Sequence, residues 1–112
     1  MLSFQRLEVY QRSIDFLVLA LEVIAELPSK GHAELADQLR RAAQSAPLNI
    51  AEGAGRSSRP DIAKHYVIAR GSAMECAAVL DVMKAQGTLK PERYERGTQL
   101  LSSIVAMLTK LM

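Results

Sequence analysis

Hydrophobic residues recur every three or four positions along almost the whole chain, which is the period of an α-helix that turns one face toward a core. The first such segment runs from Leu7 to a turn at Pro28–Gly31. Its recurring apolar positions are Tyr10, Ile14, Leu17, Leu21 and Ile24, and this face is widened by Val9, Phe16, Leu19 and Val23. So broad an apolar face predicts contacts with more than one neighbour, including contacts beyond the helix's own bundle.

A second helix is predicted from about Ala33 to about Gly55, with Pro47 inside it. Its apolar positions are Leu35, Leu39, Ala42, Ala46, Ile50 and Gly53. An interior proline removes a backbone donor and its ring clashes with the preceding turn, but here the apolar pattern resumes in phase after it. We therefore expect a helix that bends near residues 43–47 rather than one that breaks.

Capping signals indicate two further helices. Ser58 and Pro60 suit the start of a third helix, about residues 60–86, and Gly87 suits the left-handed residue that closes it. Its apolar positions are Ile62, Tyr66, Ala69, Ala73, Leu80 and Met83. Pro91 opens the fourth helix, and the side predicted to be buried consists of Leu100, Leu101, Ile104, Val105, Leu108 and Leu111.

The fold class follows from these elements. No stretch alternates apolar and polar residues for long enough to form a strand. Four helices of about 20 residues, each about 30 Å long and joined by short turns, predict an all-α fold, an antiparallel up-and-down four-helix bundle with its second helix bent near Pro47. Residues 1–112 fit a single domain, which is small enough to gain from further burial through oligomerisation.

Composition narrows the functional classes. Aromatic residues make up 4% of the chain and tryptophan is absent, so few rings are available on which exposed bases could stack. Cys76 is the only cysteine, which excludes an internal disulfide and suits a reducing cytoplasm. Charges interrupt the apolar pattern of the N-terminal segment, so we expect neither a signal peptide nor a transmembrane helix.

The stretch NIAEGAGR, residues 49–56, resembles a phosphate-binding glycine loop only in part. A dinucleotide-binding fingerprint needs G-x-G-x-x-G between a strand and a helix, whereas here Ser58 takes the third place and a helix precedes. A Walker loop is excluded because no G-K-[ST] follows. The pattern favours a helix whose alanines and glycines, Gly53 among them, let a neighbouring backbone approach closely.

No set of residues suits catalysis, a metal or a cofactor. A dimetal bundle needs Glu-x-x-His motifs, and neither His32 nor His65 follows a glutamate by three residues. Ser72 lies in GSAMEC rather than in a G-x-S-x-G elbow. Cys76 is interpreted as a small core residue and His65 as a residue on the helix surface. We therefore expect a non-enzymatic protein with no catalytic residue, no metal and no cofactor.

A line of polar side chains runs beside the apolar stripe of the second helix. Its members, at spacings of four, four, three and four, are Arg41, Ser45, Asn49, Glu52 and Arg56, and the third helix offers Gly71, Ser72 and Glu75. One interpretation is a solvated face whose ion pairs contribute little. The other is a partly buried network in which the two arginines face Glu52 and Glu75 and fix helix register or a subunit contact.

Basic residues gather around the predicted turn between the second and third helices. The formal net charge of the chain is +2, whereas residues 40–70 alone carry +4. One interpretation is ordinary surface charge that keeps the protein soluble. The other is an interface that contacts RNA or DNA phosphates without reading bases, repeated around a ring of subunits. The residues expected to make these contacts are Arg40, Arg41, Arg56, Arg59 and Lys64.

Three separated blocks of sequence resemble one known family. They are FQRLEVYQRS at residues 4–13, QLRRAAQSAPLNIAEGAGR at 38–56 and IARGSAMEC at 68–76. In these blocks, and in their order and spacing, nearly the whole chain resembles the four-helix bundle proteins encoded by intervening sequences in bacterial 23S ribosomal RNA genes. The resemblance implies a cytoplasmic bundle that assembles into a homopentameric ring around a central channel.

A related branch of this family is the accessory variability protein of diversity-generating retroelements, in which a basic pentamer binds nucleic acid and the reverse transcriptase. This chain departs from that branch in being only mildly basic. The family motif positions, which resemble an architectural signature rather than an active site, are Arg41, Asn49, Glu52, Gly53, Gly55, Arg56, Gly71, Ser72 and Glu75.

Two functional hypotheses follow. The first is a non-enzymatic, pentameric scaffold that offers a repeated basic surface to RNA or DNA and to a protein that processes nucleic acid. The alternative is a protein–protein adaptor whose apolar surfaces on the first and fourth helices serve assembly alone, with no nucleic-acid binding. Neither hypothesis involves a membrane.

Overall fold

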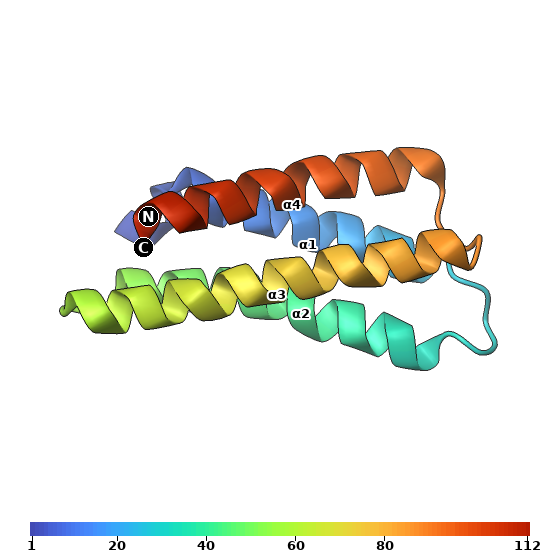
Figure 1. Ribbon diagram of the computed structural model, residues 1–112, viewed down its shortest axis with the longest axis horizontal. Helices are drawn as coiled ribbons and strands as arrows, with labels where there is room; N and C mark the ends of the chain where they lie inside the picture. The colour runs from blue at the N-terminus through green and yellow to red at the C-terminus, as the bar shows by residue number, and fades with distance from the viewer.

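The computed structural model describes all 112 residues and contains four long helices and no strand. A short 3-10 helix, η1 (Ser3–Arg6), precedes α1 (Glu8–Ala25), α2 (Ala33–Ala54), α3 (Arg59–Ala85) and α4 (Pro91–Leu111). Consecutive helices run in opposite directions and pack side by side (Figure 1). The predicted all-α, up-and-down four-helix bundle is confirmed.

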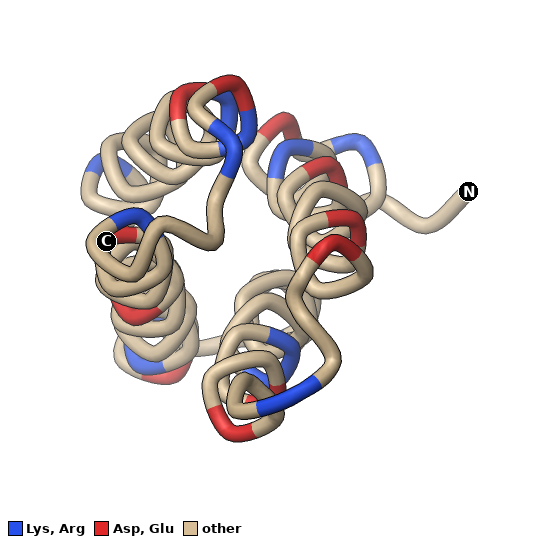
Figure 2. Tube along the Cα trace, turned by 90° about the vertical axis from the view of Figure 1, so that its right-hand side faces the viewer, with Lys and Arg blue, Asp and Glu red and all other residues tan.

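The four helices occupy the corners of the bundle (Figure 2). α1 packs against α2 and α4, and α3 packs against the same two helices, whereas the backbones of α1 and α3 do not come close to each other. α1 and α3 are therefore diagonally opposite. Because the direction alternates along the chain, these two helices also point the same way (Figure 1).

Local signals set the helix ends close to where the sequence predicts them. Ser58 is extended, and its hydroxyl accepts a hydrogen bond from the Asp61 backbone N–H at 3.3 Å. At the other end of α3, Gly87 has a φ of 75°, as expected of a left-handed closing residue. The Thr88 backbone N–H then donates to the Met83 carbonyl at 3.1 Å, which satisfies one of the last free carbonyls of α3.

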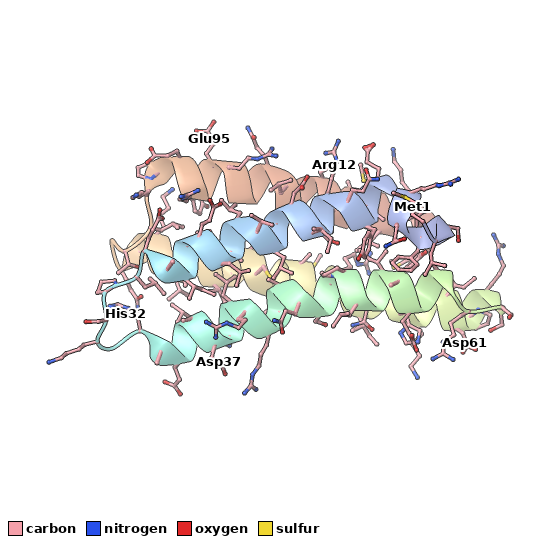
Figure 3. All side chains as sticks on the ribbon, turned by 180° about the vertical axis from the view of Figure 1, so that it is seen from behind. Met1, Arg12, His32, Asp37, Asp61 and Glu95 are labelled. Carbon is pink, nitrogen blue, oxygen red and sulfur yellow. The ribbon has the colours of Figure 1, made fainter.

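Pro47 bends α2 without ending it. The helix runs unbroken from Ala33 to Ala54 with Pro47 inside it. Figures 1 and 3 both show α2 changing direction in its middle, so that its first half diverges from α3. This bend is the predicted one, since proline cannot donate the backbone hydrogen bond that would keep the two halves in line.

The core face of α1 contains the four residues predicted to widen its apolar face, Val9, Phe16, Leu19 and Val23, rather than the predicted central stripe. Its buried residues are Val9, Ser13, Phe16, Leu19, Ala20 and Val23. The predicted stripe lies beside this face and is only half-buried at Tyr10, Ile14, Leu17 and Ile24, while Leu21 is 46% exposed. In α4, Leu111 was also predicted to be buried and is 47% exposed in the last turn, and Val105 is half-buried. α1 has two adjacent apolar stripes, so its periodicity cannot tell which one faces the core.

Two glycines allow helices to pack closely. A Cβ atom at Gly53 would lie 2.8 Å from Cε1 of Tyr66 and 3.1 Å from Cβ of His65, so side chains of α3 approach this part of α2 closely, rather than the predicted neighbouring backbone. A Cβ atom at Gly97 would lie 2.7 Å from Cδ1 of Leu80. Sequence reasoning did not single out Gly97, although it is the tighter of the two contacts.

An ion-pair cluster ties the end of α1 to the start of α4. Nη2 of Arg93 lies 2.8 Å from Oε2 of Glu26, and Nη1 of Arg93 lies 3.3 Å from Oε1 of Glu22. Nζ of Lys90 lies 3.2 Å from the same Glu26 carboxylate. The hydrogen bond from Arg93 is the main cause that lowers the pKa of Glu26 below its ordinary value of 4.5.

Acid should therefore weaken the fold partly through Glu26. Because its folded-state pKa is lower than its unfolded value, its stabilisation is complete above about pH 4.5 and is lost as the pH falls through the folded value. We expect Glu26→Gln to lower the Tm at about pH 6 and to lower it less at about pH 3. Thermal melts followed by circular dichroism measure both values. The control Glu95→Gln removes a carboxylate that makes no ion pair, and an equal Tm loss for Glu26→Gln at both pH values would contradict this role.

Candidate nucleic-acid interface

The basic residues predicted to contact phosphates fall into two groups. Arg56, Arg59 and Lys64 surround the turn between α2 and α3, at the end of the bundle that also carries both chain termini (Figure 1). Arg40 and Arg41 lie in the first half of α2. Arg56 follows Arg41 by fifteen positions, which at the rise of a helix correspond to about 22 Å. One chain therefore does not gather all five into a single patch.

The two groups also differ in whether a nearby carboxylate offsets their charge. In the first half of α2, Asp37 lies 3.1 Å from Nε of Arg41 and 3.8 Å from Nη1 of Arg40, so one carboxylate offsets part of the charge of both. Near the turn, Arg59 and Lys64 are exposed and form no ion pair. These two side chains are the most available cations of the predicted set.

Arg56 is held by its own helix. Its Nη2 donates to Oε1 of Glu52 at 2.6 Å, one turn earlier, and both side chains are largely exposed. Exposed pairs of this spacing contribute only about 0.3–0.5 kcal/mol. The pair therefore orients the guanidinium beside the turn without withdrawing it from solvent.

Distant parts of the chain add charge to the same end. The half of the bundle nearest the termini, formed by residues 1–16, 44–72 and 101–112, carries seven basic and four acidic residues, a net charge of +3. The other half carries −1, and Figure 2 shows acidic and basic positions mixed there. Sequence reasoning missed Arg6, Arg12 and Lys110, because only the folded bundle brings them into the same half as the turn.

The polar network between α2 and α3 is centred on Asn49. The Asn49 side-chain amide donates to the Ser45 carbonyl at 2.9 Å and to the Ser45 hydroxyl at 3.1 Å. From α3, the Ser72 hydroxyl donates to the Ser45 hydroxyl at 2.8 Å. Nδ1 of His65 lies 3.2 Å from Oδ1 of Asn49 and donates to it, since the Asn49 nitrogen already faces Ser45. All four residues are half-buried.

The charged members of the predicted network lie outside this cluster. Arg41, whose side chain is 80% exposed, pairs with Asp37 instead of with Glu75. Glu75 is exposed and makes no ion pair. Arg41 and Glu75 line the same hollow beside Ser45 and Ser72 but form no ion pair, because Asp37, one turn away on the same helix, offers a nearer carboxylate. The expected contact between Arg56 and Glu52 is present.

The remaining reactive side chains have structural surroundings. Cys76 is 1% exposed, and burial raises the pKa of its thiol to about 12, so it remains a protonated core residue, as predicted. His65 is half-buried and hydrogen-bonded rather than a simple surface residue. No three His, Cys, Asp or Glu side chains come together in a way that could hold a metal ion. None of the helices combines the length and the apolar character needed to cross a bilayer.

The sequence and the fold were compared with protein families and with solved structures. A family model described as 23S rRNA-intervening sequence protein matches residues 5–110. The crystal structure of a protein of unknown function from the S23 ribosomal protein family of Bacteroides thetaiotaomicron VPI-5482 is similar to the chain with a TM-score of 0.85. The two sequences are 24% identical over 92% of this chain and 96% of that one, so this likeness shows the fold alone. None of the curated proteins matches the sequence.

Proposed function

The chain belongs to the 23S rRNA-intervening sequence protein family, and from that premise we propose that it is a non-enzymatic, self-associating scaffold that binds the backbone of RNA or DNA. The observation that carries this proposal is that Arg59 and Lys64 are exposed and form no ion pair. Both lie in the half of the bundle nearest the termini, here called the basic half, which has a net charge of +3. Free cations at a turn meet phosphates at little desolvation cost, and each phosphate contact releases condensed counterions.

The aromatic residues support contact with the backbone rather than with bases. Phe16 and Tyr66 are buried in the core, and Phe4 packs edge-on against Tyr10 with ring centroids 5.0 Å apart. Tyr94 lies at the opposite end, under the Lys84 ammonium. No ring stands free beside Arg59 to stack on a base, so the interface has charge without a means of reading sequence.

Self-association makes this modest charge effective. A net charge of +3 on the basic half of one chain gives weak phosphate affinity, whereas a ring repeats the same end and multiplies the contacts. We propose a homopentamer, the assembly that the family resemblance implies. Such a ring, acting in the reducing cytoplasm to which the lone Cys76 is suited, would hold nucleic acid for a protein that processes it.

The adaptor alternative is favoured by a different observation. Large apolar side chains are exposed within the helices, chiefly on α1 and α3. The expectation had placed these surfaces on the first and fourth helices, but in α4 the only large exposed apolar side chain is Leu111, in the last turn. If these surfaces serve a protein partner and nucleic acid is not bound, association should respond little to salt.

Charge-neutral variants of the turn test the interface. We expect the double variant Arg59→Gln with Lys64→Gln to weaken binding to RNA and DNA alike. Each lost phosphate contact should lower the slope of log K against log salt by about one. The control, Lys30→Gln with Arg96→Gln, removes the same charge from unpaired residues outside the basic half. Fluorescence anisotropy at several salt concentrations gives both slopes, and an equal loss in the two double variants would contradict a phosphate site at this turn.

A further inference from the structure

The side of α3 that points away from the core is apolar. The outermost line of a bundle helix is ordinarily its most polar part. On α3 this line consists of Val67, Gly71, Met74, Ala78 and Val82, with Val67, Met74 and Val82 exposed to 48%, 53% and 44%. No charged residue interrupts the line, and the charges of this helix segment lie to either side of it, at Arg70, Glu75 and Asp81.

A second apolar line runs along the outside of α1. It consists of Ile14, Val18, Leu21 and Ala25, with Val18 54% and Leu21 46% exposed. The outer lines of the other two helices are polar: α2 presents Asp37, Arg41, Gln44, Leu48 and Glu52, and α4 presents Glu95, Gln99, Ser102 and Ala106. The two apolar lines therefore lie on diagonally opposite corners of the bundle (Figure 2).

We propose that the α1 line of one copy packs against the α3 line of a second copy. This inference rests on the self-association in the proposed function and names the surfaces that carry it. Two different surfaces on opposite corners make a head-to-tail contact, which leaves each copy with one surface of each kind still free. Repetition of such a contact closes into a ring when the rotation between neighbours allows it, whereas a single self-complementary surface would stop at a dimer.

The spacing of the two lines supports a second copy as the occupant. Successive members are four, three and four residues apart in Ile14, Val18, Leu21 and Ala25, and equally in Val67, Gly71, Met74 and Ala78. This is the heptad spacing by which two helices interlock side by side. α1 and α3 point the same way within a chain, so copies aligned side by side bring the two lines together in parallel (Figure 1).

The register that matches the two spacings puts Val18 opposite Gly71, a residue without a side chain. It also puts Leu21 opposite Met74, so that two large apolar residues meet one turn further along. A Cβ atom at Gly71 would meet no heavy atom within 4 Å, so nothing inside the chain requires this exposed, mid-helix glycine. Glycine destabilises the interior of a helix, so its presence here calls for a reason. In the proposed contact, the space left by the missing side chain of Gly71 receives Val18 of the next copy.

Charge at the edge of the contact fits the same register. In a parallel pair of helices, a residue that directly precedes an apolar position of one helix lies near a residue of the other helix that directly follows an apolar position. In the matched register, the second residue is five positions further along. This rule brings Arg70 of one copy beside Glu22 of the next. Within its own chain Arg70 donates to the Thr109 hydroxyl at 3.2 Å and Glu22 lies 3.3 Å from Arg93, so the contact between copies would add to these pairs. Both are at the flanks of the lines, where opposite charges favour one register over its alternatives.

Two charged variants and their mixture test the proposal. Val18→Glu blocks the α1 line, Met74→Glu blocks the α3 line, and the control Leu48→Glu places the same charge on the α2 surface, where Leu48 is 68% exposed. Sedimentation velocity gives the mass, and circular dichroism verifies that each variant is helical. We expect each line variant alone to be monomeric, with association weakened by about 100-fold or more, because a carboxylate would be buried without a partner. Leu48→Glu should keep the wild-type mass.

The equimolar mixture of the two line variants distinguishes head-to-tail from symmetric contact. Each variant keeps the surface that the other has lost, so we expect one heterodimer of 1:1 composition and nothing larger. A mixture that stays monomeric, a Val18→Glu variant of wild-type mass, or a monomeric wild type overturns the proposal. RNA binding by the same samples is read separately, since Val18 and Met74 are distinct from Arg59 and Lys64. A wild-type ring with these contacts and no RNA affinity would refute nucleic-acid binding and leave the interface standing.

Discussion

Replacing Leu39 with alanine is expected to lower the free energy of unfolding by about 2–5 kcal/mol, the usual cost of removing a large aliphatic side chain from a packed core. Leu39 is fully buried in α2, before the bend at Pro47, and belongs to the central hydrophobic cluster. Urea denaturation at one fixed protein concentration gives the difference.

The same helix supplies a matched control for this substitution. Leu48 is 68% exposed and belongs to the outer face of α2. Leu48→Ala should therefore change the free energy of unfolding by no more than about 0.5 kcal/mol. Similar losses for the two leucines would mean that α2 does not present Leu39 to the core.

Gly97→Val is expected to be the second strongly destabilising substitution, with a loss of about 1–3 kcal/mol. A Cβ atom at this position would lie 2.7 Å from Cδ1 of Leu80 and 3.3 Å from Cδ2 of Leu19, so side chains of both α1 and α3 would have to move. Glycine elsewhere in a helix is usually improved by substitution, since it adds backbone freedom to the unfolded chain. At Gly97 we expect the opposite, a substitution that lowers the free energy of unfolding.

Two further variants test whether crowding is the cause. Gly55→Ala places a Cβ atom no closer than 3.6 Å to its nearest neighbour, so it should be neutral or stabilising by up to about 1 kcal/mol. Leu80→Ala removes the atom nearest to the new side chain, and we expect the double variant Leu80→Ala with Gly97→Val to be more stable than the sum of the two single losses predicts. Strict additivity in urea denaturation would rule out the contact with Leu80 as the source of the loss.

Much of the fold could be predicted because the signals that begin, bend and end its helices depend on neighbouring residues in the sequence. Ser58, Gly87 and Pro91 mark helix ends by backbone chemistry that needs no distant partner, and Pro47 bends its helix wherever the helix lies. The facing of α1 could not be predicted in this way. Both its core stripe and the neighbouring stripe with Leu21 are apolar, and only the positions of the other helices decide which becomes core.

In the candidate site, too, residues close together in the sequence could be predicted and residues brought together only by folding could not. The cations of the turn, Arg59 and Lys64, are close in sequence and were predicted together, whereas Lys110 reaches that end only because the chain reverses three times. Gly97 was overlooked because the reason for its missing side chain lies on other helices.

The apolar excess of α1 was nevertheless informative. A helix that is hydrophobic over more than one face predicts a second partner, and the structure leaves Val18 and Leu21 without one inside the chain. The proposed contact with α3 of another copy would supply that partner and would account for a pattern that the isolated bundle does not use.

One measurement tests the central claim most directly. Wild-type protein is titrated into fluorescent structured RNA and into duplex DNA, at low and at physiological salt, and the mass of the protein is recorded on the same samples. We predict saturable binding by an oligomer, with an affinity that falls steeply as salt rises. An intact oligomer that binds neither nucleic acid at low salt would contradict the nucleic-acid scaffold and leave a protein–protein adaptor in its place.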